Sequence, residues 1–430
     1  MSRLGFCYCF HAVGQGLFAS GRLEDGEKRR RFDWVFDCGT SSSQAYIARE
    51  IIHYQSQFRP SQIDLFCISH FDQDHINGAF DLLRIQPIRT LILPYFSIVN
   101  RMQIALSTRN ISGAFLNFLI DPAGYLSTLA DANIGEIIYI VGGGEPPPEA
   151  GVPSPDDDRP QGDGPRDYNF EGDFKLHDLN IPPPIPPVEP PVTLAGKGAA
   201  GRVRMLSHLQ AFSVSRVWEF VFYNINKPNS ILAPLQGKVT QIVNANRYSD
   251  GSYDGKKMVE ELRKEYDNVF GKSGAKRNAI SLVAYGGPQR ASRVRNGVLL
   301  GSDVPLMSPA PRSLYPANQQ YTQMRAMSCI GIRYFGDFPL DSPPMLLPIR
   351  QHFGIPRWNN QNVLQVPHHG SRHSWYCGAV REFPSGASVF SSRITSIKHP
   401  SPIVWIDLAG RGIMAVNEYH RAFFRGYLDF

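Results

Sequence analysis

The feature that most constrains this chain of 430 residues is a short polar cluster that directly follows an apolar segment. The segment covers residues 63–69 and is typical of a buried strand, and the cluster contributes His70, Asp72, Asp74 and His75. Imidazole nitrogens and carboxylate oxygens are common ligands of zinc, manganese and iron. Polar groups packed so densely beside an apolar strand are costly to bury without a partner. The pattern therefore favours a metal site over a polar loop in which the two aspartates only cap a turn.

A pair of histidines at the end of another apolar run points to the same kind of site. His368 and His369 follow residues 363–366, and Gly370 and Ser371 permit a tight turn after them. A lone pair of histidines carries little information. Side chains at strand ends are held in place and remain accessible, so two such clusters in one chain favour a single shared site.

Two aspartates compete for a third position in this site. Asp337 follows a predicted strand at 331–335, and Asp303 follows a predicted strand at 298–300. A carboxylate at a strand end can bridge two metal ions, although turn aspartates are also common there. The residues alone do not choose between the two.

A late histidine, His399, precedes Pro400, which disfavours helix and predicts a turn or an extended segment. Taken alone, His399 is interpreted as a surface residue.

Strand-like and helix-like segments are interleaved along the chain without an internal repeat, which predicts an α/β or α+β fold. The predicted strands are 4–19, 32–39, 63–69, 91–93, 135–141, 218–223, 278–285, 298–300, 331–335 and 363–366. Helices are predicted at 44–57, from 76 to 84 and at 258–266, with a partly helical pattern over 100–133. We interpret 1–430 as one domain with loop insertions, because the length alone is only a weak guide to domain count.

A proline-rich stretch interrupts this pattern. Residues 146–191 hold 14 of the chain's 34 prolines, and prolines at this density remove backbone donors and exclude regular helices and strand ladders. We predict an insertion or linker over residues 145–195. A proline-rich ligand for another domain is the less favoured alternative.

Charge and cysteine content narrow the class of protein only moderately. The net charge of +6 suits phosphate-bearing partners but equally suits ordinary solubility, and the same holds for the basic stretches 28–31 and 290–295. The six cysteines form no Cys-x-x-Cys pair and lie mostly in apolar runs, which predicts buried free thiols. No secretory leader or long apolar segment is evident, so we expect a cytoplasmic protein without membrane contact.

The order of these motifs resembles the metallo-β-lactamase superfamily, and within it the ComEC-like branch, named for the nuclease domain of a bacterial DNA-uptake protein. The matching segments, which lie between residue 6 and about residue 406, are Val13–Gly16, Asp37–Gly39, Ser69–Gly78, Asn278–Val283, Gly336–Asp337, His368–Ser371 and His399–Pro400. The resemblance implies a four-layer αββα sandwich and a metal-dependent hydrolase, with phosphodiesterase or nuclease activity on DNA or RNA. In that branch the Gly-Asp pair precedes His-His-Gly by a few tens of residues with a helix between them, which favours Asp337 over Asp303.

The resemblance also implies roles for the candidate residues around one or two divalent ions, zinc or manganese. The implied metal ligands are His70, Asp72, Asp74, His75, Asp337 and His369, with His368 as the alternative to His369. Asp74 would also orient a water, and His368 and His399 would stabilise the charge that develops in the transition state. Asp37 and Ser371 would hold the ligand side chains in place without binding the ions themselves.

The chain departs from the usual superfamily motif at two points. Asp72 stands where a histidine is usual, which replaces a nitrogen ligand by oxygen and makes manganese plausible beside zinc. The separate mid-chain histidine has no clear counterpart, since neither His177 nor His208 has the expected context. Three alternatives to a nuclease therefore stay open. The chain could be a small-molecule phosphoesterase or a metal-binding scaffold without activity. It could also be an effector that needs a protein partner encoded in the same operon, for example an operon of a defence system.

Overall fold

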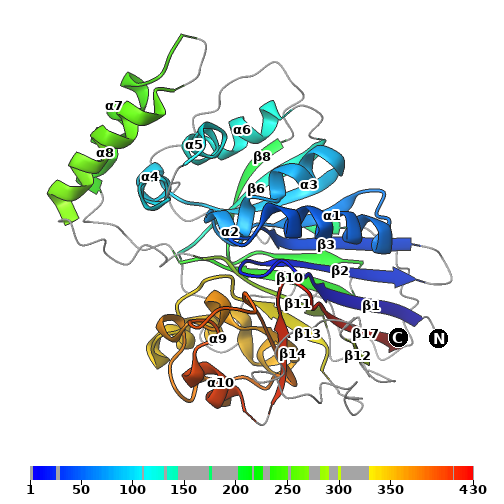
Figure 1. Cartoon of the computed structure of the whole chain (residues 1–430). Helices are drawn as coiled ribbons and strands as arrows, with labels where there is room; N and C mark the ends of the chain where they lie inside the picture. Colours follow the sequence, from blue (N-terminus) through cyan, green and yellow to red (C-terminus); the bar gives the residue numbers. More distant parts are fainter. Residues whose placement is uncertain are drawn as a thin grey trace.

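The computed structural model describes residues 3–25, 30–108, 111–129, 133–143, 174–176, 202–215, 217–225, 233–249, 253–270, 281–289, 299–301, 329–409 and 411–429. These residues form two β-sheets that pack face to face, with helices outside each sheet (Figure 1). The two-sheet α/β sandwich predicted from the sequence is confirmed.

The first sheet has nine strands among the described residues. In spatial order they are β12 (Leu299–Gly301), β17 (Ala422–Asp429), β1 (Arg3–Phe10), β2 (Phe18–Asp25), β3 (Arg30–Cys38), β4 (Ile63–Cys67), β5 (Ile88–Pro94), β6 (Ile134–Val141) and β8 (Arg202–Ser207). Strands β3, β4, β5, β6 and β8 run parallel, so their carboxyl ends lie along one edge of the sheet.

The second sheet has eight described strands. In spatial order they are β16 (Gly412–Val416), β15 (Ala387–Ser391), β14 (Gln361–Gln365), β13 (Gly331–Tyr334), β11 (Val283–Pro288), β10 (Trp218–Tyr223), β9 (Ala211–Val214) and β7 (Phe174–Leu176). Strands β13 to β16 are parallel to one another. The carboxyl ends of β13 and β14 therefore also lie at a common edge.

Helices cover the outer face of each sheet (Figure 1). On the nine-stranded side are α1 (Gln44–Phe58), α2 (Gln73–Ile76), α3 (Ala79–Ile85), α4 (Ile98–Ser107), α5 (Gly113–Ile120), α6 (Pro122–Thr128), α7 (Ala233–Ala245) and α8 (Gly255–Phe270). On the eight-stranded side are α9 (Pro343–Asn359), α10 (Pro402–Leu408) and the short 3₁₀ turns η1 (Pro367–Gly370), η2 (Arg372–Ser374) and η3 (Ala379–Glu382). The helices predicted at 44–57 and 258–266 lie within α1 and α8. The helix predicted from 76 to 84 overlaps α2 and α3, and the partly helical pattern over 100–133 overlaps α4, α5 and α6.

Aromatic side chains fill the space between the sheets. Alternate residues of β1 point inward because successive side chains of a strand face opposite sides. The rings of Trp34 and Trp218 meet across the sheets at 6.0 Å, and Phe36 stacks on Tyr334 at 4.3 Å. Rings in such contact add to the gain from burial, so this layer fixes the position of one sheet on the other.

Two expectations about local structure are wrong. The predicted strand 4–19 is two strands, because β1 ends at Phe10 and β2 begins at Phe18; between them, Gly14 and Gly16 have positive φ angles of 75° and 152°. Within the proline-rich stretch, Phe174–Leu176 forms β7 and pairs with β9, so a strand ladder is not excluded where prolines are absent.

Some predictions fall outside the described residues. They concern the rest of 146–191, residues 278–280 and 290–295, His177 and Asp303. The single-domain assignment also stays a prediction.

All six cysteines are free thiols, as predicted. Their predicted burial holds for Cys9, Cys38 and Cys67 but not for Cys377, which is exposed. No helix in the described part of the chain is both long and apolar enough to cross a membrane.

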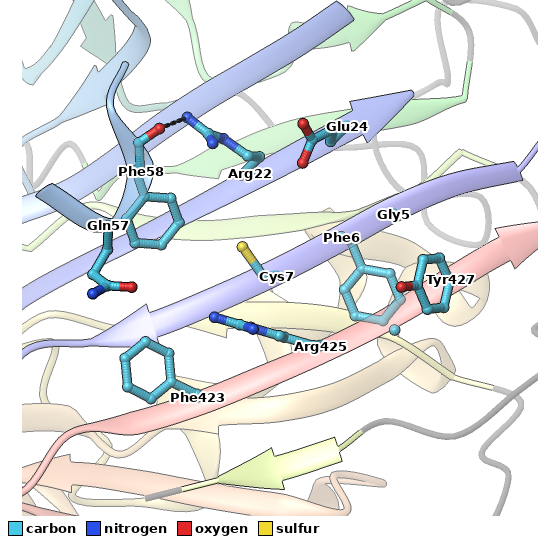
Figure 2. Close-up of a pocket in the computed structure, with 11 residues that line it drawn as sticks. Gly5, Phe6, Cys7, Arg22, Glu24, Gln57, Phe58, Phe423, Arg425 and Tyr427 are labelled. Atoms are coloured by element: carbon cyan, nitrogen blue, oxygen red, sulfur yellow. Dashed lines mark hydrogen bonds between the residues drawn. The ribbon is translucent and has the colours of Figure 1, made fainter. Parts of the chain in front are cut away.

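A cavity of about 300 Å³ lies on the outer face of β1, β2 and β17, beside the end of α1 (Figure 2). Its wall includes Arg22, whose guanidinium pairs with Asp33 at 2.7 Å and donates to the backbone oxygen of Phe58 at 2.6 Å. Burial raises the pKa of Cys7, also in the wall, to about 12, so this thiol is not a nucleophile near neutral pH. None of the residues predicted to carry chemistry lines this cavity.

Gly21 of β2 should be essential for the core, because an added Cβ would lie 2.0 Å from Cζ2 of Trp34. We expect Gly21→Ala to lower the free energy of unfolding by about 1–3 kcal/mol through overpacking. Gly237→Ala in α7 is the control, since a Cβ there meets nothing within 4 Å and should stabilise the helix by up to about 1 kcal/mol. Urea denaturation of both variants checks this, and equal stability of the two would contradict it.

Candidate metal centre

The predicted site residues converge at the edge where the carboxyl ends of the parallel strands meet. β4 leads into α2, β13 leads into Gly336 and Asp337, and β14 leads into η1. Backbone hydrogen bonds hold these segments in place. The amide of His368 donates to the oxygen of Gly336 at 2.9 Å, and the amide of Leu282, which directly precedes β11, donates to the oxygen of Ser69 at 2.8 Å. The site therefore lies between the two sheets and depends on both.

Asp337 lies at the centre of the cluster. Its Oδ1 is 3.1 Å from Nε2 of His75, and its Oδ2 is 3.6 Å from Nε2 of His70. The same Oδ2 is 3.8 Å from Nε2 of His368. One carboxylate thus faces three imidazoles that come from two different strand ends.

The remaining candidates extend the cluster on the α2 side. Oδ2 of Asp72 is 3.8 Å from Nε2 of His70, and Oδ2 of Asp74 is 3.2 Å from Nε2 of His369. Three overlapping sets have ligand atoms within 4.8 Å of one another: His70, His75 and Asp337; Asp74, His75 and His369; His70, Asp72 and Asp74. Sets that share members in this way suit one ion or two neighbouring ions.

Three buried atoms at the centre have no hydrogen-bond partner within the described chain: Nε2 of His70, Nε2 of His75 and Oδ1 of Asp337. Although two of them approach within 3.1 Å, they do not meet hydrogen-bond geometry. A buried polar atom without a partner costs about 1–3 kcal/mol. A divalent cation among these atoms would remove that cost, so the residues present fit a metal ion.

The Asp37 carboxylate orients the central histidine. It accepts hydrogen bonds from the amide and hydroxyl of Ser69, both at 2.6 Å, and it lies 2.8 Å from Nδ1 of His75. With Nδ1 donating to this carboxylate, Nε2 of His75 faces Asp337 and is the nitrogen that would bind a cation once it has lost its proton. The hydroxyl of Ser69 also lies 2.9 Å from Nδ1 of His70. Asp37 therefore positions His75 directly and His70 through Ser69.

The second histidine pair sits on an unusual backbone. His368, His369 and Gly370 have consecutive positive φ angles of 49°, 56° and 78°. Such a conformation is unfavourable for residues with a side chain and is retained where surrounding contacts impose it. Such contacts are present here, because the amide of His368 donates to the oxygen of Gly336 and the amide of Ser401 donates to the oxygen of Gly370, both at 2.9 Å.

His399 packs against this pair, although from the sequence alone it was interpreted as a surface residue. It is half-buried, and its ring lies 6.0 Å from that of His368 and 6.3 Å from that of His369. Burial, with the neighbouring imidazoles of His369 and His368, lowers the pKa of His399 to about 4. The imidazole is therefore neutral at physiological pH.

Charge is strongly coupled inside the cluster. Burial alone would raise the pKa of Asp337, but the imidazoles of His368, His75 and His70 hold it well below its usual range. For His75, burial acts to lower the pKa, while the carboxylates of Asp337 and Asp37 raise it well above its usual range. In the absence of an ion, protons therefore occupy the positions that a cation would take.

Other predicted or candidate groups lie apart from this centre. His208 packs on the rings of Tyr223 and His352 at 5.5 and 4.6 Å and belongs to none of the three donor sets. The hydroxyl of Ser371 accepts from the amide of His373, and its amide donates to the oxygen of His368 at 2.9 Å, so Ser371 contacts the histidine pair through its backbone while the predicted role of its side chain stays a prediction. Side-chain support for His368 comes from Ser374, whose Oγ is 3.0 Å from Nδ1 of His368, a contact that no sequence motif signalled.

A further group, His11, Glu50 and His53, is also close enough to hold an ion. However, the carboxylate of Glu50 accepts from Arg421 at 2.6 and 2.8 Å and from Arg49 at 3.0 Å. A metal ion would have to displace or face these guanidiniums. This group is therefore better explained as a buried ion pair that joins β1, α1 and β17.

Comparison with known proteins agrees with the fold. Residues 34–96 match the family model of the metallo-beta-lactamase superfamily, a range that includes Asp37 and the cluster from His70 to His75. No curated protein matches the chain. Members of this superfamily are mostly metal-dependent hydrolases, and the fold implies divalent metal binding by the histidines and aspartates present here. The ComEC-like branch stays a prediction.

Asp37→Asn tests how much the site depends on the group that orients His75. The asparagine amide offers one acceptor oxygen instead of two, and asparagine tolerates the positive φ of 54° at this position. We expect metal affinity to fall about 10–100-fold with the fold retained. The control is Asp81→Asn, which removes an exposed carboxylate paired with Arg84. Metal titration by calorimetry checks this, and equal affinities of the two variants would contradict it.

Proposed function

We propose that this chain is a metal-dependent phosphodiesterase that cleaves DNA or RNA. The observation that carries the proposal is the meeting of three buried atoms without hydrogen-bond partners, on His70, His75 and Asp337, inside overlapping sets of metal donors. The superfamily match over residues 34–96 supports hydrolysis as the reaction class.

The proposed metal ligands form two groups that share one carboxylate. The first group is His70 and Asp72, the second is Asp74, His75 and His369, and Asp337 lies between them. The two oxygens of Asp337 face different histidines, so this carboxylate would contribute a donor to both groups. The oxygen donors of Asp72 suit manganese as well as zinc. When bound, such ions lower the pKa of a water ligand toward neutrality and polarise a phosphoryl oxygen.

The other side chains would act on substrate and water. The side chain of Asp74 is 20% exposed and would orient the attacking water by accepting a hydrogen bond from it. His368, with its side chain 27% exposed, is held by Ser374 at Nδ1 and keeps Nε2 on the open side of Asp337. We assign to His368 and His399 the stabilisation of negative charge that develops on the phosphoryl oxygens.

Nucleic acid is the proposed substrate for two reasons. The motif order resembles the ComEC-like branch, and the net charge of +6 is compatible with a polyanionic partner.

The first measurement is hydrolysis of single- and double-stranded DNA and RNA by the purified chain. We expect cleavage that stops when metal is chelated and returns with zinc or manganese. Asp74→Asn should lower kcat/KM at least about hundredfold, about 2.7 kcal/mol, because it removes a metal ligand and the group that orients water. Asp341→Asn, an exposed carboxylate outside the donor sets, serves as the control and should leave kcat/KM unchanged.

Other outcomes would replace the proposal. Bound metal with hydrolysis of small phosphoesters alone would identify a small-molecule phosphoesterase. Metal-loaded protein that acts only after addition of a protein encoded beside it would identify a partner-dependent effector. A chain that binds no metal would be a scaffold of the same fold.

A further inference from the structure

We propose that Arg372 and Lys398 bind the phosphates that flank the scissile one, so that the substrate is a polynucleotide chain rather than a small phosphoester. This inference rests on the proposed function and specifies the substrate of the same site. It assigns a binding role to two cations that no sequence motif singled out.

Arg372 is placed beside the cluster by the turn that follows the histidine pair. The amide of Ser371 donates to the oxygen of His368 at 2.9 Å, and Ser374 contacts Nδ1 of the same histidine. Arg372 lies between these two anchored serines, in η2, with its side chain exposed. Its Nε lies 3.4 Å from Nε2 of the neighbouring His373, whose side chain is also exposed.

Lys398 reaches the cluster from another segment. It is exposed and directly precedes His399, whose ring packs on His368. The segment is fixed at both ends. The guanidinium of Arg393 donates to Ser42 Oγ at 3.1 Å and to the backbone oxygen of Ser41, and the amide of Ser401 donates to the oxygen of Gly370 at 2.9 Å. Lys398 is therefore next in sequence to a residue whose ring packs on His368, and Arg372 lies in a turn that is anchored to the same histidine.

Neither cation is neutralised by a carboxylate of the described residues. Within the part of the chain that the structure describes, no carboxylate lies within ion-pair distance of Arg372 or Lys398. Several other exposed cations are paired: Arg31 with Glu24 at 2.8 Å, Arg84 with Asp81 at 2.9 Å and Lys238 with Glu265 at 2.7 Å.

Two exposed cations without a described carboxylate partner, in separate segments that both contact His368, suit a ligand with several negative charges. A small phosphoester has one phosphate, which the metal centre itself would take. A nucleic acid brings further phosphates at each side, and contacts to these set position rather than sequence preference. Each such contact strengthens binding and makes it more sensitive to salt.

The test measures binding separately from cleavage. The full-length, metal-loaded protein is titrated into a labelled single strand with phosphorothioate linkages, which resist hydrolysis, over a range of salt concentrations. We expect the double variant Arg372→Gln/Lys398→Gln to raise Kd about tenfold and to reduce the slope of log Kd against log salt by about 1.4, or about 0.7 for each lost contact. The control is Arg425→Gln, which removes another exposed guanidinium without a described carboxylate partner, on the outer face of β17 (Figure 2).

Hydrolysis gives a second readout. The ratio of kcat/KM for an unmodified single strand to kcat/KM for bis(p-nitrophenyl) phosphate should fall about tenfold in the double variant. An unchanged Kd and salt slope, or an equal change in Arg425→Gln, would overturn the inference even if the enzyme cleaves nucleic acid. If wild-type protein hydrolyses no phosphodiester, the proposed function fails, while the binding titration still reports on the two cations.

Discussion

The buried carboxylate of Asp37 is the group on which the geometry of the candidate metal centre depends. It sits at the end of β3 and is held by three contacts, to the amide and hydroxyl of Ser69 and to Nδ1 of His75. A buried charge is tolerated when hydrogen bonds satisfy it, and here the satisfying groups are the residues that flank the cluster. The end of β3, the end of β4 and helix α2 are thereby fixed relative to one another. The imidazoles of His70 and His75 are left with Nε2 directed at Asp337.

Much of this arrangement is predictable from local sequence. An apolar strand followed by His70, Asp72, Asp74 and His75 places those side chains at a strand end, and the carboxyl ends of parallel strands lie at one edge. The same logic applies to His368 and His369 after β14. For Asp337, the strand pattern left Asp303 as a rival; the structure brings Asp337 into contact with three imidazoles, while Asp303 lies outside the described residues.

What the sequence did not reveal depends on contacts between distant segments. Ser374 supports His368 only because consecutive left-handed residues turn the chain back on itself. The packing of His399 on His368 requires the 393–401 segment to dock on Ser41, Ser42 and Gly370. Neither contact has a periodic or compositional signature. His399 lies in a non-helical bend, in line with the predicted turn or extended segment, but its contact with the cluster could come only from tertiary structure or from the resemblance to a known family.

The order in which the site's segments occur along the chain has a consequence for protein synthesis. The candidate ligands and their neighbours come from β3, α2, the end of β13, η1 and the segment before α10, and strand β17 at residues 422–429 completes the first sheet beside β1. Contacts between residues so far apart form late and slowly in folding. A ribosome-bound chain that ends before β13 holds His70 and His75 but not Asp337 or His369. The candidate metal centre can therefore assemble only after β13, η1 and the 393–401 segment have also been made, so a partly synthesised chain carries the first donors without the groups that complete the site.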